Sequence, residues 1–494
     1  MDESNRSPEP AANASGLDQL YRDAPAHSSR RTLYALVIAV SVAMVVGRIL
    51  SVVFLIEPWT KEWPADRPAT YPTLSSNDRS RWATIRALVD EGTYVVGKRV
   101  VDPETGEYED SGIRSEEGFT GVDYVLRPGD NLFFSSKPPL LSTLLAGPYW
   151  VLQKLTGWTL AEQPGEVVRT LLVFCNAVPL LVYLVVLSGM LDRYGRTEWG
   201  RSYVLLAASF GTFLTTFCMT LNNHTFAAFS TLFVLCFLLR IWNDGDRRWW
   251  VFALAGLLAG LNVACEMPAA AFAAGVFVLL LSKAPARTLL GYVPALALVV
   301  AAMLLTNYLA IGRFSPAYSF QRIDDPDDPD FGWYHFEGSH WTDEKIEGID
   351  AADEPKTIYA MHALVGHHGI FSLSPIFLLS VWGAFLAIKE ASPLRVAAAL
   401  TVVLSVVVVG FYIAYTNNYG GSTAGLRWTF WLIPLWLVLM LPAADRLVCC
   451  RAGRAIGLVL LAVSALSAAY PTWNPWRATW LYRWMEYLGW FNYS

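Results

Sequence analysis

Long apolar runs are the feature that most constrains the fold of this chain, because a helix needs about 20 apolar residues to cross a bilayer. Runs of roughly that length predict an all-α polytopic membrane protein with about 11 transmembrane helices, at 32–56, 168–190, 202–220, 224–242, 249–265, 267–282, 288–311, 369–388, 396–416, 427–443 and 455–471. The composition agrees, since 54% of the 494 residues are hydrophobic and 16% are charged. Soluble domains are less apolar than this.

One further apolar segment, 138–155, decides the predicted orientation. It carries Pro139, Pro148 and Lys154 and would be a poor span. Cytoplasmic loops collect Lys and Arg, and all the basic loops fall on the side of the N-terminus only when 138–155 is not counted as a span. We therefore predict an interfacial or re-entrant helix at 138–155, with the N-terminus inside and the C-terminus outside.

The polar regions between the spans define the remaining organisation. On this topology two long polar regions face outside, and both are predicted to carry interfacial helices. The N-terminal segment is rich in Ser, Ala and Pro and has no apolar core, which predicts disorder. The aromatic C-terminal segment is typical of an interfacial membrane anchor. The predicted parts are a disordered cytoplasmic tail 1–31, a transmembrane module 32–311 with its outer loop 57–137, a second outer loop 312–366, transmembrane helices 367–471 and an aromatic interfacial tail 472–494.

Charge and cysteine usage exclude several classes of protein. The net charge is −5, and the Lys and Arg residues are scattered at the ends of segments, so no nucleic-acid partner is expected. The six cysteines lie in apolar segments or in one short basic loop, so no disulfide framework is expected. The sequence also lacks glycine-rich phosphate loops and nucleophile-elbow patterns.

The first outer loop contains an apolar stripe at helical spacing. Its residues are Trp82, Ile85, Leu88 and Val89. This spacing predicts an amphipathic helix that lies on the membrane surface. Asp78 stands at the start of the helix, where an aspartate either serves as an N-cap or supplies a catalytic carboxylate.

The same loop ends in Lys137-Pro138-Pro139-Leu140 at the predicted membrane boundary. An ammonium group held at the depth of the lipid headgroups is well placed to bind a phosphate. A lysine in this position can equally be an anchor whose stem lies along the apolar surface.

Other polar residues are predicted to reach the same face. Asn223 and His224 join two spans, Glu266 joins the next two, and Arg427 follows a glycine-rich turn. Ionisable residues at membrane depth are costly and mark functional sites, although a Glu266–His224 pair can also simply join two helices. The guanidinium of Arg427 matches the geometry of a phosphate.

Two adjacent histidines, His367 and His368, close the second outer loop. Paired histidines can bind a metal, but no His-x-x-x-His pattern and no cysteine lie near them. We interpret them as hydrogen-bonding residues at the rim of a pocket and predict no metal site.

These motifs resemble the GT-C class of membrane glycosyltransferases, in particular the branch that includes bacterial aminoarabinose transferases and protein O-mannosyltransferases. In that family a long outer loop opens on Asp-Glu-x-Arg-Tyr-Ala and ends in Lys-Pro-Pro-Leu, and another large outer loop follows span seven. Residues 78–83 are similar to the first pattern, and 137–140 match the second. The stretch from Gly420 to Arg427 looks like the Gly-Gly-x-x-x-Gly-Pro-Arg of many members. Arg79 departs from the pattern, because the family has Glu there.

The resemblance implies a GT-C type of fold and the transfer of a sugar from a polyprenyl-phosphate donor to an acceptor hydroxyl. The reaction would take place at the outer face of the plasma (inner) membrane. Asp78 would be the catalytic base, with Glu266, Asp90 or Glu91 as the fallback. The substrate- and phosphate-binding residues predicted from the motifs and the resemblance together are Arg81, Lys137, Asn223, His224, His367, His368 and Arg427.

The predicted partners are the lipid-linked sugar, a glycan, lipid or protein acceptor, and membrane lipids. The motifs imply no cofactor, and the sequence leaves dependence on a divalent cation open. Two other functions also stay open. A transporter or flippase of lipid-linked sugars would carry charges in the middle of spans and internal repeats. A catalytically inactive member with a binding role is suggested by Arg79.

Overall fold

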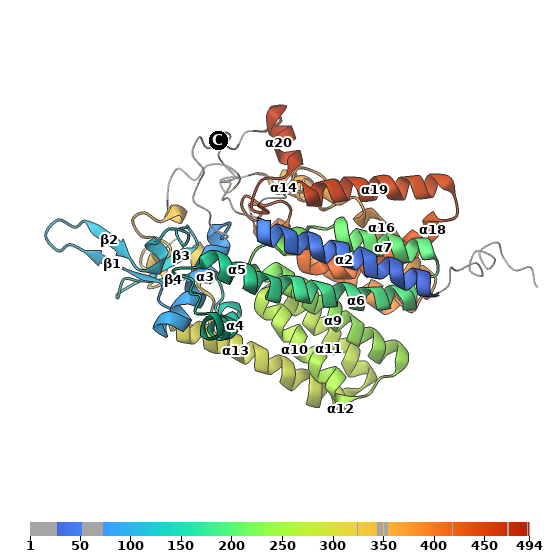
Figure 1. Ribbon diagram of the computed structural model, residues 1–494, viewed down its shortest axis with the longest axis horizontal. Helices are drawn as coiled ribbons and strands as arrows, with labels where there is room; N and C mark the ends of the chain where they lie inside the picture. Colours follow the sequence, from blue (N-terminus) through green and yellow to red (C-terminus); the bar gives the residue numbers. More distant parts are fainter. Residues whose placement is uncertain are drawn as a thin grey trace, which may run out of the picture.

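A computed structural model describes residues 27–51, 73–323, 325–342, 349, 354–416, 418–471, 474–491 and 493. Long helices lie side by side in a bundle, and strands, short helices and loops cover one end of it (Figure 1). We call this covering part the outer layer. Most of the predicted tail 1–31, the start of the first outer loop up to residue 72 and Trp473 lie outside the described residues.

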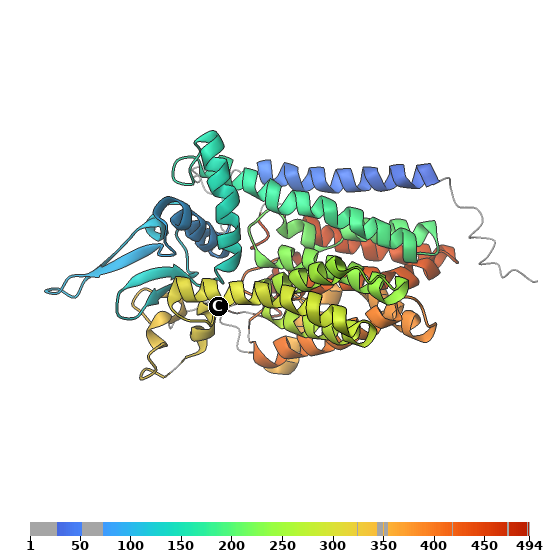
Figure 2. The same ribbon diagram turned by 90° about the horizontal axis from the view of Figure 1, so that it is seen from below.

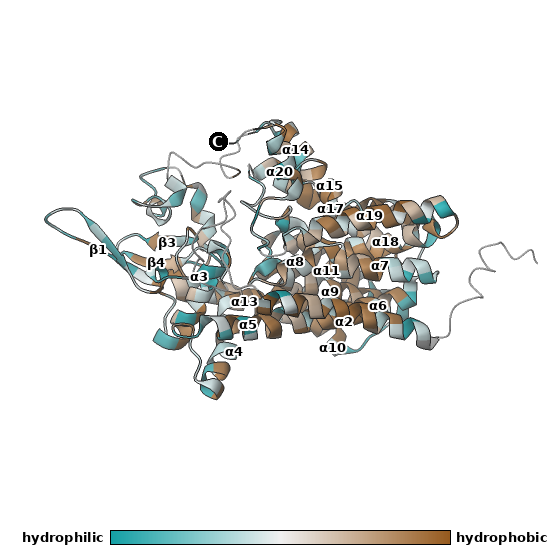
Figure 3. Ribbon diagram, turned by 45° about the horizontal axis from the view of Figure 1, so that its top comes forward, coloured by the Kyte–Doolittle hydropathy of each residue, from teal (hydrophilic) through white to brown (hydrophobic). Residues whose placement is uncertain are grey.

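Seven helices of the described part are long and apolar enough to cross a membrane. They are α2 (His27–Ser51), α5 with α6 (Pro164–Tyr194), α9 (Asn223–Asp244), α12 with α13 (Pro285–Ile311), α17 (Arg395–Tyr415), η10 with α18 (Arg427–Leu447) and α19 (Arg451–Ala469). Three shorter apolar helices, α10 (Trp249–Cys265), α11 (Ala270–Lys283) and α16 (Phe377–Lys389), belong to the same bundle. Figure 3 shows that hydrophobic residues dominate these helices.

Several of these helices contain a change of helix type. A π-helical turn, η3 (Val173–Ala177), joins α5 (Pro164–Leu172) to α6 (Val178–Tyr194). Another, η5 (Thr288–Tyr292), joins α12 (Pro285–Arg287) to α13 (Val293–Ile311). The 3-10 turns η4 (Met267–Ala269) and η10 (Arg427–Leu432) precede α11 and α18 (Ile433–Leu447), respectively.

Helix length and composition do not confirm the predicted count of 11 spans. The predicted span 202–220 divides into α7 (Glu198–Phe210) and α8 (Phe213–Phe217), because the backbone of Thr212 is extended. The prediction for the N-terminal tail was also wrong at its end. Residues 27–31 belong to helix α2 and are not disordered.

Helix α4 (Leu140–Thr156) corresponds to the segment 138–155 that was predicted to be interfacial. It lies crosswise to the long helices at the end of the bundle, as the teal helix in Figure 2 shows. It is not among the helices of the described part that are long and apolar enough to cross a membrane. Its orientation agrees with the interfacial prediction.

The predicted amphipathic helix is present as α3 (Ser76–Arg86) with the π-helical turn η1 (Ala87–Glu91). Trp82 and Ile85 are fully buried and belong to the main hydrophobic core. The helix therefore packs inside the protein, against α4 and the strand β4 (Leu132–Ser135), and its apolar stripe does not face the membrane surface as predicted. An apolar stripe has the same spacing in both situations, so the sequence alone did not separate them.

The first outer loop also contains a four-stranded antiparallel sheet, and the prediction of an all-α fold was wrong in this part. The strands are β1 (Gly97–Val101), β2 (Tyr108–Ser111), β3 (Tyr124–Arg127) and β4 (Leu132–Ser135), and their order is β2-β1-β4-β3. A short 3-10 turn, η2 (Ile113–Ser115), lies between the two hairpins. Strands of four or five residues give too few alternations for the period of two to stand out in the sequence.

The second outer loop packs against this sheet. Val125 and Phe134 of the sheet share a hydrophobic cluster with Phe320 and Trp333. The second loop is built from short elements, namely η6 (Ala317–Arg322), η7 (Phe331–Trp333), η8 (His340–Thr342) and α14 (Lys356–Leu364), and the short helix α15 (Ile370–Leu373) follows it. The two outer loops therefore form one layer at the same end of the bundle.

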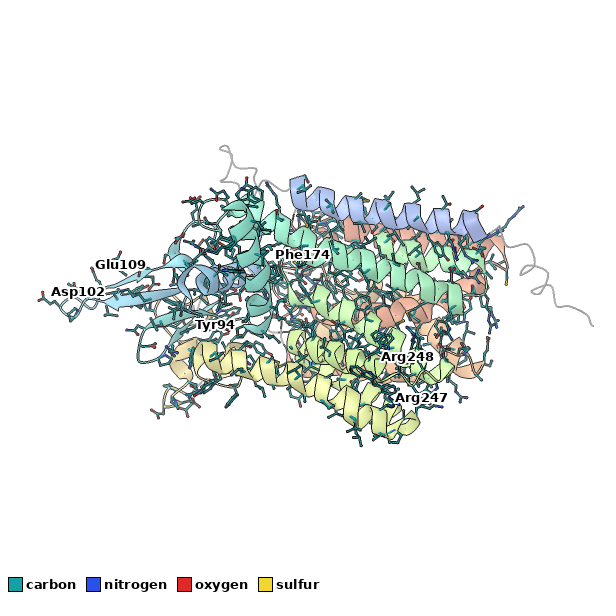
Figure 4. The ribbon with its side chains drawn as sticks, turned by 60° about the horizontal axis from the view of Figure 1, so that its bottom comes forward. Tyr94, Asp102, Glu109, Phe174, Arg247 and Arg248 are labelled. Carbon is teal, nitrogen blue, oxygen red and sulfur yellow. The ribbon has the colours of Figure 1, made fainter. Side chains whose placement is uncertain are left out.

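The arginine-rich loops lie at the opposite end of the bundle. Figure 4 shows Arg247 and Arg248 at one end and Asp102 and Glu109 at the other. Ion pairs join different loops at the basic end, namely Arg193–Asp244, Arg196–Glu390 and Arg446–Glu390. This separation of charge is the pattern from which the orientation was predicted.

The close packing of α16 against α18 depends on Gly383. A Cβ atom at this position would collide with the carbonyl oxygen of Leu439. Gly383→Ala should therefore lower the thermal unfolding temperature in detergent, with a cost of about 1–3 kcal/mol for the forced shift. Gly410→Ala in α17 is the control, because a Cβ atom there meets open space. Equal unfolding temperatures of the two variants would contradict this account of the α16–α18 contact.

Candidate functional site

Helix α3 begins with a capping box that includes Asp78. The N-cap residue is Ser75, whose side chain accepts a hydrogen bond from the Asp78 N–H. Asp78 accepts bonds at Oδ2 from the Leu74 N–H (3.0 Å) and at Oδ1 from the Ser75 N–H (2.6 Å) and hydroxyl (2.9 Å). Asp78 is thus the third residue of the helix, and not the N-cap that was one of its two predicted roles.

The surroundings of Asp78 are mostly its own helix start. Burial raises the pKa of the Asp78 carboxyl, although the donors of Leu74 and Ser75 oppose this. Arg79, which stands where the resembling family has Glu, donates to the carbonyl oxygens of Thr73 and Thr120, each at 3.1 Å. Both side chains therefore fasten the start of α3 to the neighbouring loops.

Asp78→Asn should destabilise the outer layer and leave the activity of the folded protein close to that of wild type. Both carboxylate oxygens accept backbone N–H groups, whereas an amide offers one acceptor oxygen and a donor, so a buried N–H loses its partner at a cost of about 1–3 kcal/mol. Thermal unfolding measures this effect. Asp102→Asn is the control, because Asp102 accepts the N–H of Glu104 in an exposed turn. A folded Asp78→Asn protein that is inactive would identify Asp78 as the base.

Lys137 pairs with a carboxylate that sequence reasoning missed. Its Nζ lies 2.6 Å from Oδ1 of Asp123. Asp123 directly precedes β3 and Ser136 directly follows β4, so the antiparallel pairing of these strands brings Asp123 beside Lys137. The Asp123 N–H also donates to the Ser76 hydroxyl (2.7 Å), which connects the pair to the start of α3.

A chain of hydrogen bonds connects two further cations. Arg81 Nη2 donates to Asn223 Oδ1 (2.7 Å), and Asn223 Nδ2 donates to Glu266 Oε1 (2.7 Å). His224 Nδ1 bonds to the same Glu266 oxygen. Arg427 Nη1 lies 2.9 Å from Nε2 of His224. Five predicted site residues are thus joined in one network that runs from α3, through the start of α9 and the end of α10, to η10.

Local sequence explains how the network is positioned. Asn222 caps α9 by accepting the Thr225 N–H (3.0 Å), which places the next two residues, Asn223 and His224, in its first turn. Glu266 ends α10, where its backbone is extended just before Pro268. The first turn of α9 and the C-terminal end of α10 therefore meet.

A glycine turn holds Arg427. The Arg427 Nε donates to the Gly420 carbonyl oxygen at 2.9 Å. Gly420 has a φ of +93°, a backbone angle that residues other than glycine rarely adopt. A Cβ atom at this position would also lie 3.1 Å from Arg427 Nε. The guanidinium also lies over the Trp476 ring, with 5.1 Å to its centroid.

The three cations act on one carboxylate. Burial alone would raise the pKa of Asp123, but Lys137, with added effects of Arg427 and Arg81, holds the pKa below its usual value. Burial lowers the pKa of Arg81 to about 10, so Arg81 is still a cation at neutral pH. We call Arg81, Lys137 and Arg427 the cation cluster, because Lys137 contacts Asp123 and the other two lie near enough to lower its pKa.

Two buried donors beside the cluster have no partner among the described residues. They are Nε of Arg81 and Nε1 of Trp476. Lys137 lines a small pocket together with Thr84, Tyr94 and Asn307, which places the pocket between α3 and the end of α13. Cations and unsatisfied donors are suited to bind an anion such as a phosphate. Lys137 is the member of the cation cluster that lines the pocket, and neither Arg81, Arg427 nor Trp476 is among its lining residues.

His367 and His368 lie apart from the hydrogen-bond chain of Arg427. Their Nδ1 atoms are 2.6 Å apart, His367 Nε2 is 2.9 Å from the Tyr493 hydroxyl, and His368 Nε2 is 3.2 Å from the Thr423 carbonyl oxygen. Both rings are fully buried. They make hydrogen bonds, as predicted, but they belong to a second cluster, and their role in substrate binding stays a prediction.

The C-terminal tail takes part in the site, although it was predicted only as a membrane anchor. Trp476 is buried, and Asn474 Nδ2 donates to the Leu74 carbonyl oxygen (3.1 Å). Trp484 and Trp490 of the same tail are exposed. The tail after span 455–471 therefore covers the start of α3 and the Arg427 guanidinium, and only its end offers aromatic residues to a membrane. No sequence signal distinguished Trp476 from the exposed tryptophans.

These features define a multi-pass membrane protein with an ionisable site where the helical bundle meets the outer layer. Neither a protein-family model nor a curated protein matches the chain by sequence. Solved structures of the oligosaccharyltransferase from Archaeoglobus fulgidus, a GT-C class protein, are similar to it.

The apo form of that enzyme has a TM-score of 0.44 and 13% identity, over 92% of this chain and 57% of its own. A form tethered with an acceptor peptide containing the NVT sequon has a TM-score of 0.43 and 15% identity, over 89% of this chain and 54% of its own. A complex of that enzyme with an inhibitory peptide and a dolichol-phosphate has a TM-score of 0.39 and 14% identity, over 89% of this chain and 55% of its own. This chain thus spans little more than half the length of these structures.

Proposed function

We propose that this chain is a membrane glycosyltransferase that moves a sugar from a polyprenyl-phosphate donor to an acceptor hydroxyl at the outer face of the plasma membrane. The observation that carries the proposal is the cation cluster, because a sugar that leaves a lipid phosphate leaves negative charge behind. The cluster lies where the bundle ends, so an isoprenoid chain can stay among the helices while its phosphate reaches the cations. A glycan, a lipid or a protein supplies the hydroxyl.

Different residues of the site have different roles in the proposed reaction. The acceptor oxygen forms a bond to the anomeric carbon, and the bond between that carbon and the phosphate oxygen breaks, so the phosphate leaves with the electron pair. Arg81, Lys137 and Arg427 neutralise the phosphate. A carboxylate accepts the proton of the hydroxyl. Glu266 fits this role better than Asp78, because Glu266 is bonded into the network of the cations and Asp78 is bonded to its own helix start.

The competing function is the flipping of the lipid-linked sugar. Deletion of the gene followed by lipid and glycan analysis separates the two. A transferase predicts that the donor lipid accumulates in a form that an impermeant oxidant reaches in intact cells, and that one outer glycan, lipid or protein lacks its sugar. Donor lipid that accumulates only in the protected inner leaflet would favour a flippase. An unchanged donor pool and unchanged glycans would contradict both.

The proposed face of the membrane predicts the accessibility of two positions. Glu109→Cys, in the outer hairpin, should react with an impermeant thiol reagent in intact cells. Arg247→Cys, at the basic end, should react only after permeabilisation, because basic loops are retained in the cytoplasm. The background needs Cys449 and Cys450 replaced by serine, since both are exposed in a basic loop. Labelling of position 247 but not 109 in intact cells would reverse the proposed orientation.

A further inference from the structure

A second cluster of ligating side chains lies in the outer layer, apart from the hydrogen-bond chain of Arg427. Glu354, His362 and His367 each offer one ligand atom, and these atoms all lie within 4.8 Å of one another. Glu354 precedes α14, His362 lies in α14, and His367 follows it. The two histidines are buried and Glu354 is partly buried.

The hydrogen bonds of the histidine pair direct a lone pair into this cluster. His368 Nε2 faces the carbonyl oxygen of Thr423, which only accepts, so this nitrogen carries a hydrogen. With both rings neutral, His368 Nδ1 is then an acceptor and His367 Nδ1 is the donor to it. His367 Nε2 is therefore unprotonated and points away from His368, toward Tyr493.

One phenol proton serves two acceptors at this point. The Tyr493 hydroxyl lies 2.9 Å from His367 Nε2 and 2.6 Å from Glu354 Oε1. The other Glu354 oxygen already accepts the hydroxyl of Tyr419. The single hydroxyl proton of Tyr493 can satisfy only one of these two acceptors. The other, either Glu354 Oε1 or His367 Nε2, is left without a donor, and a cation bound between them would satisfy both.

His362 adds a further unsatisfied nitrogen. Its Nδ1 is buried without a hydrogen-bond partner among the described residues and faces Gly366. Its Nε2 is 3.9 Å from Glu354 Oε1, too far for a hydrogen bond. Nε2 of His362 therefore points toward the Glu354 carboxylate without a hydrogen bond to it.

The geometry points to a binding site for a divalent transition metal, zinc by the nature of its ligands, formed by Glu354, His362 and His367. Two histidines with one glutamate are a known zinc ligand set, and the fourth position is open to the Tyr493 oxygen or to water. Ligands of a tetrahedral zinc at about 2.0–2.2 Å lie about 3.4 Å apart. The rings of His362 and His367, which stack with centroids 4.0 Å apart, would rotate to reach it.

The surrounding residues supply what such a site needs from its second layer. His368 orients His367 and is itself held by Thr423, while Tyr419 holds the free oxygen of Glu354. Outer-layer bonds of this kind fix the ligand tautomer and are worth about 10–100-fold in metal affinity. A metal here would hold together the chain before and after α14, and the bonds of Tyr419, Thr423 and Tyr493 connect the site to the turn that carries Arg427 and to the C-terminal tail.

The sequence pattern had favoured hydrogen-bonding histidines over a metal site. His362 lies five positions before His367, outside the expected His-x-x-x-His spacing, and Glu354 is farther away. The end of α14 at Leu364 turns the chain so that these residues meet. The proposal does not depend on the proposed function, because its test measures metal.

The test uses the full chain purified in detergent, stripped with a chelator and titrated with zinc chloride. Wild type should bind a single zinc ion per chain by elemental analysis, and cobalt in its place should give the visible spectrum of a tetrahedral site. Glu354→Gln keeps the size of the side chain and an acceptor for its tyrosine partners, yet should weaken zinc binding by more than about 100-fold, since even outer-layer changes reach that size. His362→Ala should do the same.

The control is His335→Ala, which removes a histidine of the same outer loop that stacks on Phe331 and does not belong to the cluster. It should bind zinc as wild type does. The proposal is overturned if stripped wild type takes up no zinc, or if Glu354→Gln binds zinc as tightly as wild type. Should His362→Ala fail to fold, the Glu354→Gln titration decides the question alone.

Discussion

Arg427→Ala should lower the kcat/KM of sugar transfer by about 10²–10³-fold, the size of effect seen when one donor to a developing negative charge is removed. Arg427 bonds the Gly420 carbonyl oxygen and His224 and lies over Trp476, so its guanidinium is held in place before any substrate arrives. A pre-positioned cation stabilises the departing phosphate without reorganisation. The measurement is transfer from a radiolabelled polyprenyl-phosphate sugar in reconstituted membranes.

Arg127→Ala provides the matched control for Arg427. Arg127 lies in the same outer layer, at the end of β3, and pairs with Asp130 at the surface. Surface ion pairs contribute about 0–1 kcal/mol, so this variant should keep both its stability and its transfer activity. The cation cluster would lose its proposed role if Arg427→Ala, folded by thermal unfolding, transferred sugar as fast as Arg127→Ala.

Glu266→Gln should lower the rate of transfer by about 10²- to 10⁴-fold, as expected for the loss of a general base. Glutamine keeps the size of the side chain and an oxygen for the Asn223 amide, which lies 2.7 Å from Glu266 Oε1 in the wild type. The substitution therefore removes the charge and the proton acceptor while the geometry of the hydrogen-bond network is retained. Binding of the donor lipid, measured separately, should change less than the rate.

Asp90→Asn is the control for Glu266, because Asp90 is a carboxylate of the same layer that is bonded to Gln153 at 3.0 Å. Its activity should stay near that of wild type. Comparison with Asp123→Asn extends the test, since Asp123 is the carboxylate nearest to Lys137 in the hydrogen-bond pattern. Full activity of Glu266→Gln together with loss in Asp123→Asn would transfer the role of base to Asp123.

Several features of the site follow from local sequence. The apolar runs predicted a membrane bundle, and helix α4 was predicted as an interfacial helix from its prolines and lysine and from the distribution of charge among the loops. Glu266, His224 and Arg427 were selected because ionisable groups at membrane depth are costly unless they are used, and Lys137 was selected because an ammonium at headgroup depth can bind a phosphate. This argument needs no knowledge of which residues touch.

Other features depended on contacts that the sequence does not record. Asp123 is one of many aspartates in a polar loop, and only the β3–β4 pairing places it beside Lys137. The role of Asp78 also needed the structure, because an aspartate at a helix start has the same neighbours in the sequence whether its oxygens accept backbone N–H groups or face a substrate. Glu354, His362 and His367 lie too far apart in the chain for a spacing rule.

The sequence by itself determined that this protein lies in a membrane and at which ends of its helices the charged residues fall, because both depend on the transfer of individual side chains between water and lipid. The tertiary structure alone decided that α3 is buried instead of lying on the membrane, that short strands build the outer layer, and which cation meets which carboxylate. Those outcomes depend on contacts between residues that are distant in the chain. The interaction energy of such a pair depends on both residues, so it cannot be predicted from the position of either one in the sequence.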